Sequence, residues 1–251
     1  MEYTLKKSLG QHFLKDENVC KSIFEEIRQH SFTQLLEVGP GGGALTKFLL
    51  QIPAINFKAV ELDREKVQYL QSTYPAITGK LIEEDFLKMD PPFDGEFVVV
   101  GNYPYNISTQ ILFKMLDWRE QVPVMVGMFQ KEVAQRAASK EGSKVYGVLS
   151  VLIQAFFKVE YLFDVDPSCF NPPPKVVSGV IRLTRRTDVP DMKSVRSFFV
   201  LVKTAFNQRR KTMRNAVKSL FEEDLLKDDF FKKRAEVISV EQFAALTFKM
   251  R

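Results

Sequence analysis

The sequence is poor in the residues that stabilise small secreted proteins and bind zinc. Its 251 residues include two cysteines and two histidines. Cys20 and Cys169 form no Cys-x-x-Cys pair, so we expect neither a disulfide framework nor a Cys/His zinc site. This composition is typical of a reducing compartment, and it predicts a cytoplasmic protein without a bound metal.

Long apolar runs are also missing. The stretch GVLSVLIQAFF at residues 147–157 is far shorter than the roughly 18 residues that a membrane-spanning helix needs. The N-terminal MEYTLKKSLGQHFLKDE lacks the apolar centre of a signal peptide. With 45% hydrophobic and 27% charged residues, the composition is that of a globular protein, and no membrane partner is expected.

Acidic residues are absent from one long stretch near the C-terminus. Residues 187–251 contain 14 Lys and Arg residues but 9 Asp and Glu residues, so the +5 charge of the chain arises there. Within this part, residues 193–218 contain eight basic residues and no acid. A merely solvated helix would use acids for i,i+4 pairs, so this tract favours a polyanionic partner, and a nucleic acid in particular.

Short apolar runs alternate with helical patterns between about residue 33 and residue 186. The predicted strands cover residues 34–39, 55–63, 77–85, 96–102, 123–130 and 178–184, and helical patterns cover residues 43–51, 64–72 and 108–118. This alternation predicts an α/β domain at residues 1–186, with a mostly parallel, doubly wound sheet. Residues 187–251 show only helical patterns, so we predict a small, basic, all-helical domain there.

A glycine-rich turn follows the first predicted strand, in LLEVGPGGGAL at residues 35–45. Gly39 and Gly41 would let the backbone turn tightly and approach a ligand, and the helix start would offer free N–H groups. Gly39, Gly41 and Ala44 match the pattern GxGxxG/A of dinucleotide-binding proteins. A plain joint between strand and helix is the alternative interpretation.

Acids stand at the ends of three successive predicted strands, namely Glu37, Glu61 and Asp85. These strand ends meet in the crevice where open α/β sheets bind ligands. Glu61 could accept both ribose hydroxyls of a nucleoside, while Asp85 could accept the adenine amino group and Phe86 could pack against the ring. Since no pyrophosphate grip is needed for such contacts, they favour S-adenosylmethionine as the ligand.

The fourth strand ends in GNYPYNIS, residues 101–108. The amino nitrogen of adenine is a poor nucleophile because its lone pair is delocalised into the ring. If the Asn102 side-chain oxygen and the Tyr103 carbonyl accept its two protons, the lone pair turns towards a methyl donor without a strong base. Pro104 would fix the backbone and Tyr105 would stack on the base, although a loop held by aromatic packing is the alternative.

A second cluster, CFNPPPKVVSGV, precedes the last predicted strand. Its Phe170 could form the other wall of a pocket for a flipped base, with Lys175 near a phosphate. The alternative is a rigid proline-rich loop without a role in binding.

Together these motifs resemble the ribosomal RNA adenine N6,N6-dimethyltransferases, a family that includes the erythromycin-resistance methylases and a mitochondrial transcription-factor branch. The matching segments are KKSLGQHFLKD, EVGPGGGALT, VELD, EEDF, GNYPYNIST, FNPPPKVVSGVIRL and AFNQRRKTMRN, in family order over nearly the whole chain. The resemblance implies a Rossmann-like class I methyltransferase that uses S-adenosylmethionine and releases S-adenosylhomocysteine.

The resemblance also implies roles for individual residues. Residues 1–18 would contact cofactor and RNA, and Tyr105 and Phe170 would sandwich the adenine. Cofactor contacts would fall on His12, Leu14, Gly39, Glu61, Asp85 and Asn102, and RNA contacts are expected at Lys175, Arg209, Arg210, Lys211 and Arg214. Two residues depart from the family pattern: His12 stands where many members have Asn, and Tyr103 replaces the usual Leu of the NLPY form. Because only the Tyr103 backbone is assigned a role, we expect little effect there.

The segments SLGQHFL, FNPPPKVVS and F..RRK..RN resemble the bacterial housekeeping branch. That branch dimethylates two adjacent adenosines in the 3′-terminal hairpin loop of 16S, or small-subunit, rRNA. The resemblance therefore implies an assembling 30S particle as the partner. We also expect the protein to be a monomer. The alternatives are a resistance-type methylase of large-subunit rRNA and a ribosome-assembly factor that binds RNA without catalysis. An NAD-dependent dehydrogenase is disfavoured because no residues for hydride transfer are apparent.

Overall fold

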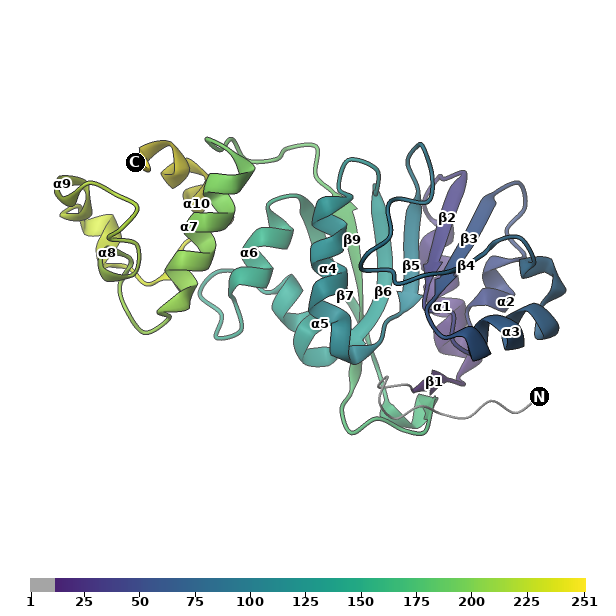
Figure 1. The fold of residues 1–251 in the computed structure, drawn as a ribbon. Helices are drawn as coiled ribbons and strands as arrows, with labels where there is room; N and C mark the ends of the chain where they lie inside the picture. The colour runs from purple at the N-terminus through teal and green to yellow at the C-terminus, as the bar shows by residue number, and fades with distance from the viewer. Residues whose placement is uncertain (1–11) are drawn as a thin grey trace. The chain divides into compact units, whose positions relative to one another are not determined.

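The computed structural model describes residues 12–251, so residues 1–11 of the predicted N-terminal contact segment lie outside it (Figure 1). Contacts divide the chain into two compact units. The first comprises the described residues up to Ala134 together with Glu160–Arg185, and the second comprises Gln135–Val159 and Arg186–Arg251. The helical residues after the predicted boundary at 187 therefore share a unit with Gln135–Val159. The assignment of separate functions to residues 1–186 and 187–251 stays a prediction.

A seven-stranded sheet in the order β4-β3-β2-β5-β6-β9-β7 forms the framework. Its strands are β2 (Gln34–Val38), β3 (Asn56–Glu61), β4 (Leu81–Glu83), β5 (Val98–Asn102), β6 (Val124–Gln130), β7 (Phe157–Val165) and β9 (Ser178–Arg185). Strands β2 to β6 pair in parallel, and β9 pairs antiparallel with β6. The predicted α/β class with a mostly parallel sheet is confirmed.

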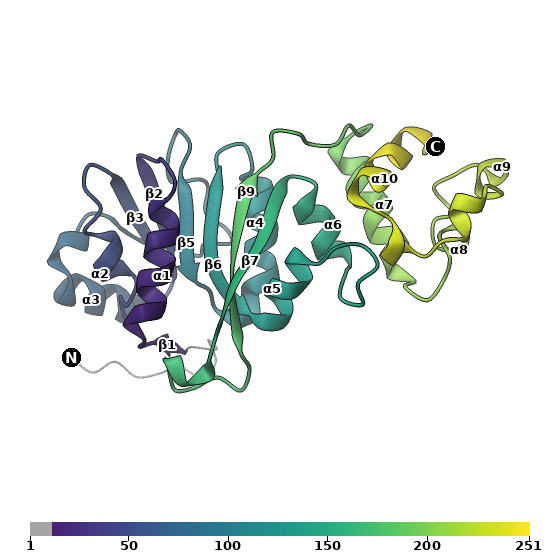
Figure 2. The ribbon, with the colours of Figure 1, turned by 180° about the vertical axis from the view of Figure 1, so that it is seen from behind.

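Helices cover both faces of the sheet. Figure 1 shows α4 (Ser108–Asp117) in front of it, and the reverse view in Figure 2 shows α1 (Glu17–Arg28) in front. The Asp16 carboxylate caps α1 by accepting from the backbone N–H groups of Asn18 and Val19. Further helices of the first unit are α2 (Thr46–Leu49) and α3 (Arg64–Thr73), and α5 (Lys131–Ala138) follows β6.

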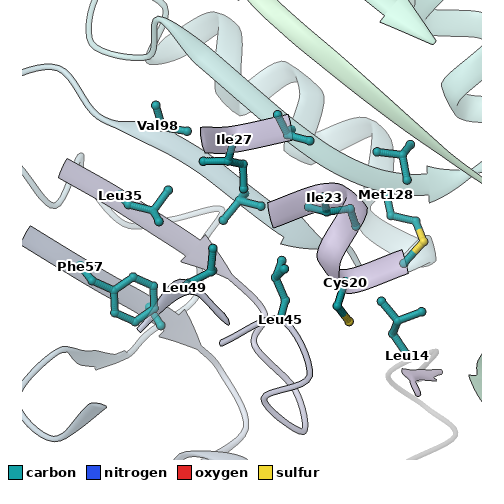
Figure 3. Close-up of a cluster of buried hydrophobic side chains, with 14 of the residues drawn as sticks. Leu14, Cys20, Ile23, Ile27, Leu35, Leu45, Leu49, Phe57, Val98 and Met128 are labelled. Atoms are coloured by element: carbon teal, nitrogen blue, oxygen red, sulfur yellow. The ribbon is translucent and has the colours of Figure 1, made fainter. Parts of the chain in front are cut away.

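The core on the α1 side joins the amphipathic helix to the apolar strands. Ile23 and Ile27 are fully buried and belong to the same cluster as Leu35 of β2 and Val98 of β5 (Figure 3). Burying each such side chain contributes about 1.5–3 kcal/mol relative to exposure. This packing holds the strands in register, so the polar residues at their carboxyl ends converge at one edge.

The second unit is helical, as the C-terminal pattern predicts. Its helices are α6 (Val148–Gln154), α7 (Val195–Asn207), α8 (Met213–Ala216), α9 (Glu223–Leu226) and α10 (Val240–Leu246). Ser194 caps α7 by accepting from Ser197 N, and the helix buries Phe198, Leu201, Val202 and Ala205. The Phe206 ring lies 5.9 Å from the Phe243 ring of α10, centre to centre.

Three strands were not predicted. The apolar run at 147–157 contains the whole of α6 and the first residue of β7, and a continuous apolar run does not separate a helix from a strand. The other two, β1 (Phe13–Leu14) and β8 (Phe170–Asn171), form a separate two-stranded sheet. In the described part of the chain, no helix combines the length and apolar character that crossing a membrane requires.

Candidate active site

A cavity of about 400 Å³ opens at the carboxyl ends of β2, β3, β4 and β5. Ten of the predicted site residues line it. They are His12, Leu14, Gly39, Glu61, Asp85, Phe86, Asn102, Tyr103, Pro104 and Tyr105. A cavity of this size at this edge is of the kind that holds a nucleoside-sized ligand in open α/β sheets.

The glycine turn forms one wall of this cavity. Gly39 and Gly41 have φ angles of +67° and +57°, in the left-handed region where a side chain would cause strain. The N–H of Gly39 donates to the Val60 carbonyl at 2.9 Å, which fixes the turn against β3. The turn thus has the tight backbone conformation that the sequence predicted, and its approach to a ligand stays a prediction.

Glu61 is held rigidly at the end of β3. Only 7% of the residue is exposed. Its Oε1 accepts from Asp63 N at 3.0 Å, its Oε2 accepts from Gly41 N at 3.4 Å, and the Lys66 ammonium lies 3.9 Å from Oε2. The carboxylate therefore has a fixed position on the cavity wall, where remaining lone pairs can accept from a ligand hydroxyl.

Glu37 lies deeper, at the end of β2. It is 1% exposed, and its Oε2 accepts from the Thr46 hydroxyl at 2.7 Å. Burial raises the pKa of Glu37 to about 8, against a smaller opposing effect of the Thr46 hydrogen bond. Burial therefore favours the neutral form of this carboxyl group, unlike an acid at the surface.

Asp85 and Phe86 follow β4 and complete the far wall. Asp85 is half-buried, with its Oδ1 accepting from Leu87 N at 3.0 Å and its Oδ2 3.6 Å from the Lys88 ammonium. Phe86 packs edge-on against Trp118, with ring centres 5.2 Å apart. Leu62, which was not predicted, also lines the cavity although it is 59% exposed. An apolar residue directly after a strand-ending acid is the signal that could have identified it.

The NYPY segment leaves the sheet at the end of β5. Tyr103 N donates to the Met128 carbonyl at 3.2 Å, and after Pro104 a short 3-10 helix runs over Tyr105–Ile107. The Asn102 amide nitrogen Nδ2 lies 3.5 Å from the His12 carbonyl and donates to it. Because the amide N–H makes this bond, the side-chain oxygen Oδ1 is the part of the Asn102 amide that remains as an acceptor.

The segment that begins at His12 is attached to the proline-rich loop. Strand β1 pairs antiparallel with β8, so that Phe13 lies opposite Asn171 and Leu14 opposite Phe170. The His12 ring nitrogen Nδ1 is 2.8 Å from the Pro172 carbonyl. The side chains of His12 and Leu14 reach the cavity through this pairing, which no local sequence pattern reveals.

Phe170 and Lys175 do not line the cavity. Phe170 is 1% exposed and belongs to the core cluster that also contains Leu14 and Cys20. Lys175 is exposed in the loop before β9. Phe170 therefore serves packing in this structure, and its predicted role as a base-stacking wall remains untested.

The predicted RNA-binding residues of the second unit differ in their surroundings. Arg209 donates to the Tyr146 and Lys144 carbonyls and pairs with Glu236, and Arg214 donates to the Leu226 carbonyl at 2.7 Å. The side chains of Arg210 and Lys211 are exposed, and neither has a partner among residues 12–251. The side chains of Arg209 and Arg214 are thus already bonded within the protein, whereas those of Arg210 and Lys211 are available for a ligand.

Metal-binding residues are not clustered. Within residues 12–251, no group of three or more His, Cys, Asp and Glu side chains is placed to hold a metal ion. The polar side chains around the cavity are instead carboxylates, the amides of Asn102 and Asn106, the Lys66 ammonium, the His12 ring and tyrosine hydroxyls. Such groups suit hydrogen bonding to an organic ligand.

Comparisons with known proteins point to one family over nearly the full length of this chain. A family profile described as "Ribosomal RNA adenine dimethylase" matches residues 2–247. The chain is 50% identical to "Ribosomal RNA small subunit methyltransferase A" of Flavobacterium johnsoniae, over 98% of this chain and 95% of that protein. It is 52% identical to the protein of the same name from Bacteroides thetaiotaomicron, over 96% of this chain and 92% of that protein.

Solved structures show the same fold. A dimethyladenosine transferase from Plasmodium falciparum is 25% identical with a TM-score of 0.80, over 92% of this chain and 94% of that chain. A 23S rRNA methyltransferase, ErmE, shares the fold with a TM-score of 0.74 at 22% identity, over 95% of this chain and 99% of that chain.

Proposed function

This chain belongs to the ribosomal RNA adenine dimethylase family, and from that premise we propose that it dimethylates N6 of two adjacent adenosines in small-subunit rRNA. The methyl donor is S-adenosylmethionine, which leaves as S-adenosylhomocysteine. The observation that supports this reaction best is the orientation of the Asn102 amide at the cavity edge.

The cavity residues suit the parts of this cofactor. The Glu61 carboxylate, which backbone N–H groups already fix, would accept the ribose hydroxyls. Asp85 would accept the adenine amino group, while Phe86 and the exposed Leu62 would cover the adenine ring. The turn at Gly39 would lie against the amino-acid part, and His12 and Leu14 would close the opposite side. When bound, the cofactor supplies a methyl group on a positively charged sulfur.

The protein's part in the reaction is to aim the nitrogen lone pair of the target. Asn102 Oδ1 and the Tyr103 carbonyl each accept a hydrogen bond from one of the two N–H groups of the adenine amino group. Since the His12 carbonyl accepts from Nδ2, the amide cannot turn over without losing that hydrogen bond. The acceptor is therefore preorganised, and no strong base is required.

The target base needs a surface on which to stack once it has flipped out of the RNA loop. The Tyr105 ring lines the cavity beside Asn102 and supplies this surface. A second wall at Phe170 would require that side chain to leave the core in which it lies. Lys175, exposed on the same loop, would contact a phosphate near the flipped base.

The proposed substrate is the 3′-terminal hairpin loop of 16S rRNA within an assembling 30S particle, bound by a monomer in the cytoplasm. Loop bases splay out easily, and the basic residues of the second unit suit a phosphate backbone. Two other functions would use the same features. A resistance-type methylase would modify large-subunit rRNA, and an assembly factor would bind the particle without needing catalysis.

One experiment separates these functions. Radiolabelled S-adenosylmethionine is incubated with the protein and unmethylated small subunits, and the rRNA is digested to nucleosides and chromatographed. We expect label in N6,N6-dimethyladenosine from small-subunit RNA. Label only in large-subunit RNA would assign the chain to the resistance type, and tight subunit binding without label would favour the assembly factor.

A further inference from the structure

We propose that Ser178 is a positioning residue that fixes the Tyr105 ring for stacking on the target adenine, an inference that rests on the proposed function. The hydroxyl groups of the two residues lie 2.5 Å apart, a short hydrogen bond in which either oxygen can donate. Ser178 is fully buried and does not line the cavity. It would therefore act on the substrate only through Tyr105.

Ser178 is a rigid anchor because the backbone around it is fixed. It is the first residue of β9 and lies opposite Gln130 in the antiparallel pairing with β6. Just before it, the Val177 carbonyl accepts from Lys131 N at 2.9 Å. The position of the serine hydroxyl is thus set by the sheet and not by the loop that precedes it.

Tyr105 by contrast is only half-buried, in a short 3-10 helix outside the sheet. Without a bond at its far end, the ring could turn about two side-chain torsions. A stacking surface must hold its plane if the target nitrogen is to meet the Asn102 acceptor, because small misplacements of a reacting group cost much rate. The Ser178 bond supplies the second fixed point, at the phenol oxygen.

The neighbouring aromatic side chain, His12, is held by the loop that precedes Ser178. The His12 ring lies 5.6 Å from the Tyr105 ring, centre to centre, with a tilt of 31°. Its Nδ1 is bonded to the Pro172 carbonyl at 2.8 Å. The first residue of β9 therefore fixes the Tyr105 ring, and the proline-rich loop before it fixes the His12 ring. The loop thereby has a positioning role that does not depend on Phe170.

The test compares Ser178→Ala, Tyr105→Phe and the double variant in single-turnover methylation of unmethylated small subunits. We expect each single variant to lower the methyl-transfer rate about 5- to 20-fold, because each removes the same hydrogen bond. Affinities for subunits and for S-adenosylmethionine should stay within about twofold of wild type, since both variants keep an aromatic ring at position 105. The double variant should be no slower than the slower single variant.

Thr184→Val is the matched control. Thr184 lies on the same strand as Ser178 but opposite Val124, at the other end of β6. Removing the Thr184 hydroxyl should leave the methyl-transfer rate unchanged. If Ser178→Ala does not fold, Tyr105→Phe still tests the bond from its half-exposed side. Rates of the single variants equal to wild type, or losses that multiply in the double variant, would overturn the positioning role alone. An inactive wild-type protein would overturn the proposed function with it.

Discussion

The Tyr103 ring occupies the space that a side chain at Gly127 would need. Gly101 and Gly127 lie opposite each other on β5 and β6, and the ring rests across this pair. A Cβ at Gly101 would come 2.7 Å from the ring, and one at Gly127 would overlap it. The ring is 1% exposed, and its hydroxyl has no hydrogen-bond partner among residues 12–251. The tyrosine at this position is thus matched to a glycine on the next strand.

This packing predicts a specific rescue. Gly127→Ala should lower the free energy of unfolding by about 1–3 kcal/mol, because the added methyl group overpacks the core. Adding Tyr103→Leu should restore most of the loss, since leucine vacates the space over the glycine. Denaturant unfolding of the three variants measures both effects.

Tyr103→Phe is the control for this rescue. It keeps the ring, so it should not rescue Gly127→Ala. By itself it should stabilise the protein by about 1 kcal/mol, because it removes a buried hydroxyl that has no partner. Equal rescue by Leu and Phe would show that the overlap with the ring is not the cause of the destabilisation.

The sheet and the cavity could be predicted because their signals are local. Buried parallel strands appear as continuous apolar runs, and a polar residue after such a run lies at the edge where ligands bind. Glu61, Asp85 and Asn102 were identified in this way, and all three line the cavity.

The unpredicted parts depend on contacts between distant segments. The pairing of β1 with β8 involves two residues on each strand, too few to create a period in the sequence. It is this pairing that buries Phe170 against Leu14, whereas the sequence suggested either the wall of a base pocket or a rigid proline-rich loop. The basic tract likewise does not reveal that the Arg214 guanidinium is already bonded to backbone carbonyls.

The bond between Asn102 and His12 predicts how two substitutions should differ. Asn102→Ala removes the acceptor for the target amine, and we expect turnover to fall at least about 100-fold with RNA affinity roughly unchanged. Asn102→Asp keeps an acceptor but replaces the donor towards the His12 carbonyl with a repelling oxygen. Its turnover should fall less than that of Asn102→Ala. Turnover and subunit binding, measured separately, check this, and full turnover by Asn102→Ala would refute the mechanism.

The buried Glu37 predicts an unusual dependence of stability on pH. Its pKa is raised from 4.5 to about 8 in the folded protein, so between these values the folded state binds the proton that the unfolded state has lost. The contribution of Glu37 to stability is therefore full below about pH 4.5. It falls by up to about 1.4 kcal/mol per pH unit as the pH rises towards 8.

Glu37→Gln should remove this slope, since glutamine stays neutral and can still accept from Thr46. Denaturant unfolding of the ligand-free protein at pH 5, 6, 7 and 8 measures the free energy of unfolding of both proteins. That of the variant should rise relative to that of wild type as the pH rises. Glu83→Gln, at an exposed position at the end of β4, is the control and should leave the slope unchanged. A constant difference between Glu37→Gln and wild type at all four values would contradict the assignment.

The basic residues of the second unit should separate into two groups. Arg210→Ala and Lys211→Ala remove exposed charges without partners in the described chain, so each should weaken RNA binding and reduce the salt dependence by about one released ion. Their melting temperatures should not change. Arg214→Ala should instead destabilise the protein by about 1–2 kcal/mol, because its guanidinium satisfies the Leu226 and Lys227 carbonyls at the end of α9.

Titration of RNA binding between about 50 and 200 mM salt, beside thermal unfolding, tests this division. Lys80→Ala removes one exposed charge just before β4 and serves as the control for net charge alone. If Lys80→Ala weakened binding as much as Arg210→Ala, the overall charge of the chain would explain the affinity. A larger effect at Arg210 and Lys211 would instead assign the RNA contact to this turn after α7, because only a charge close to a phosphate displaces its counterion.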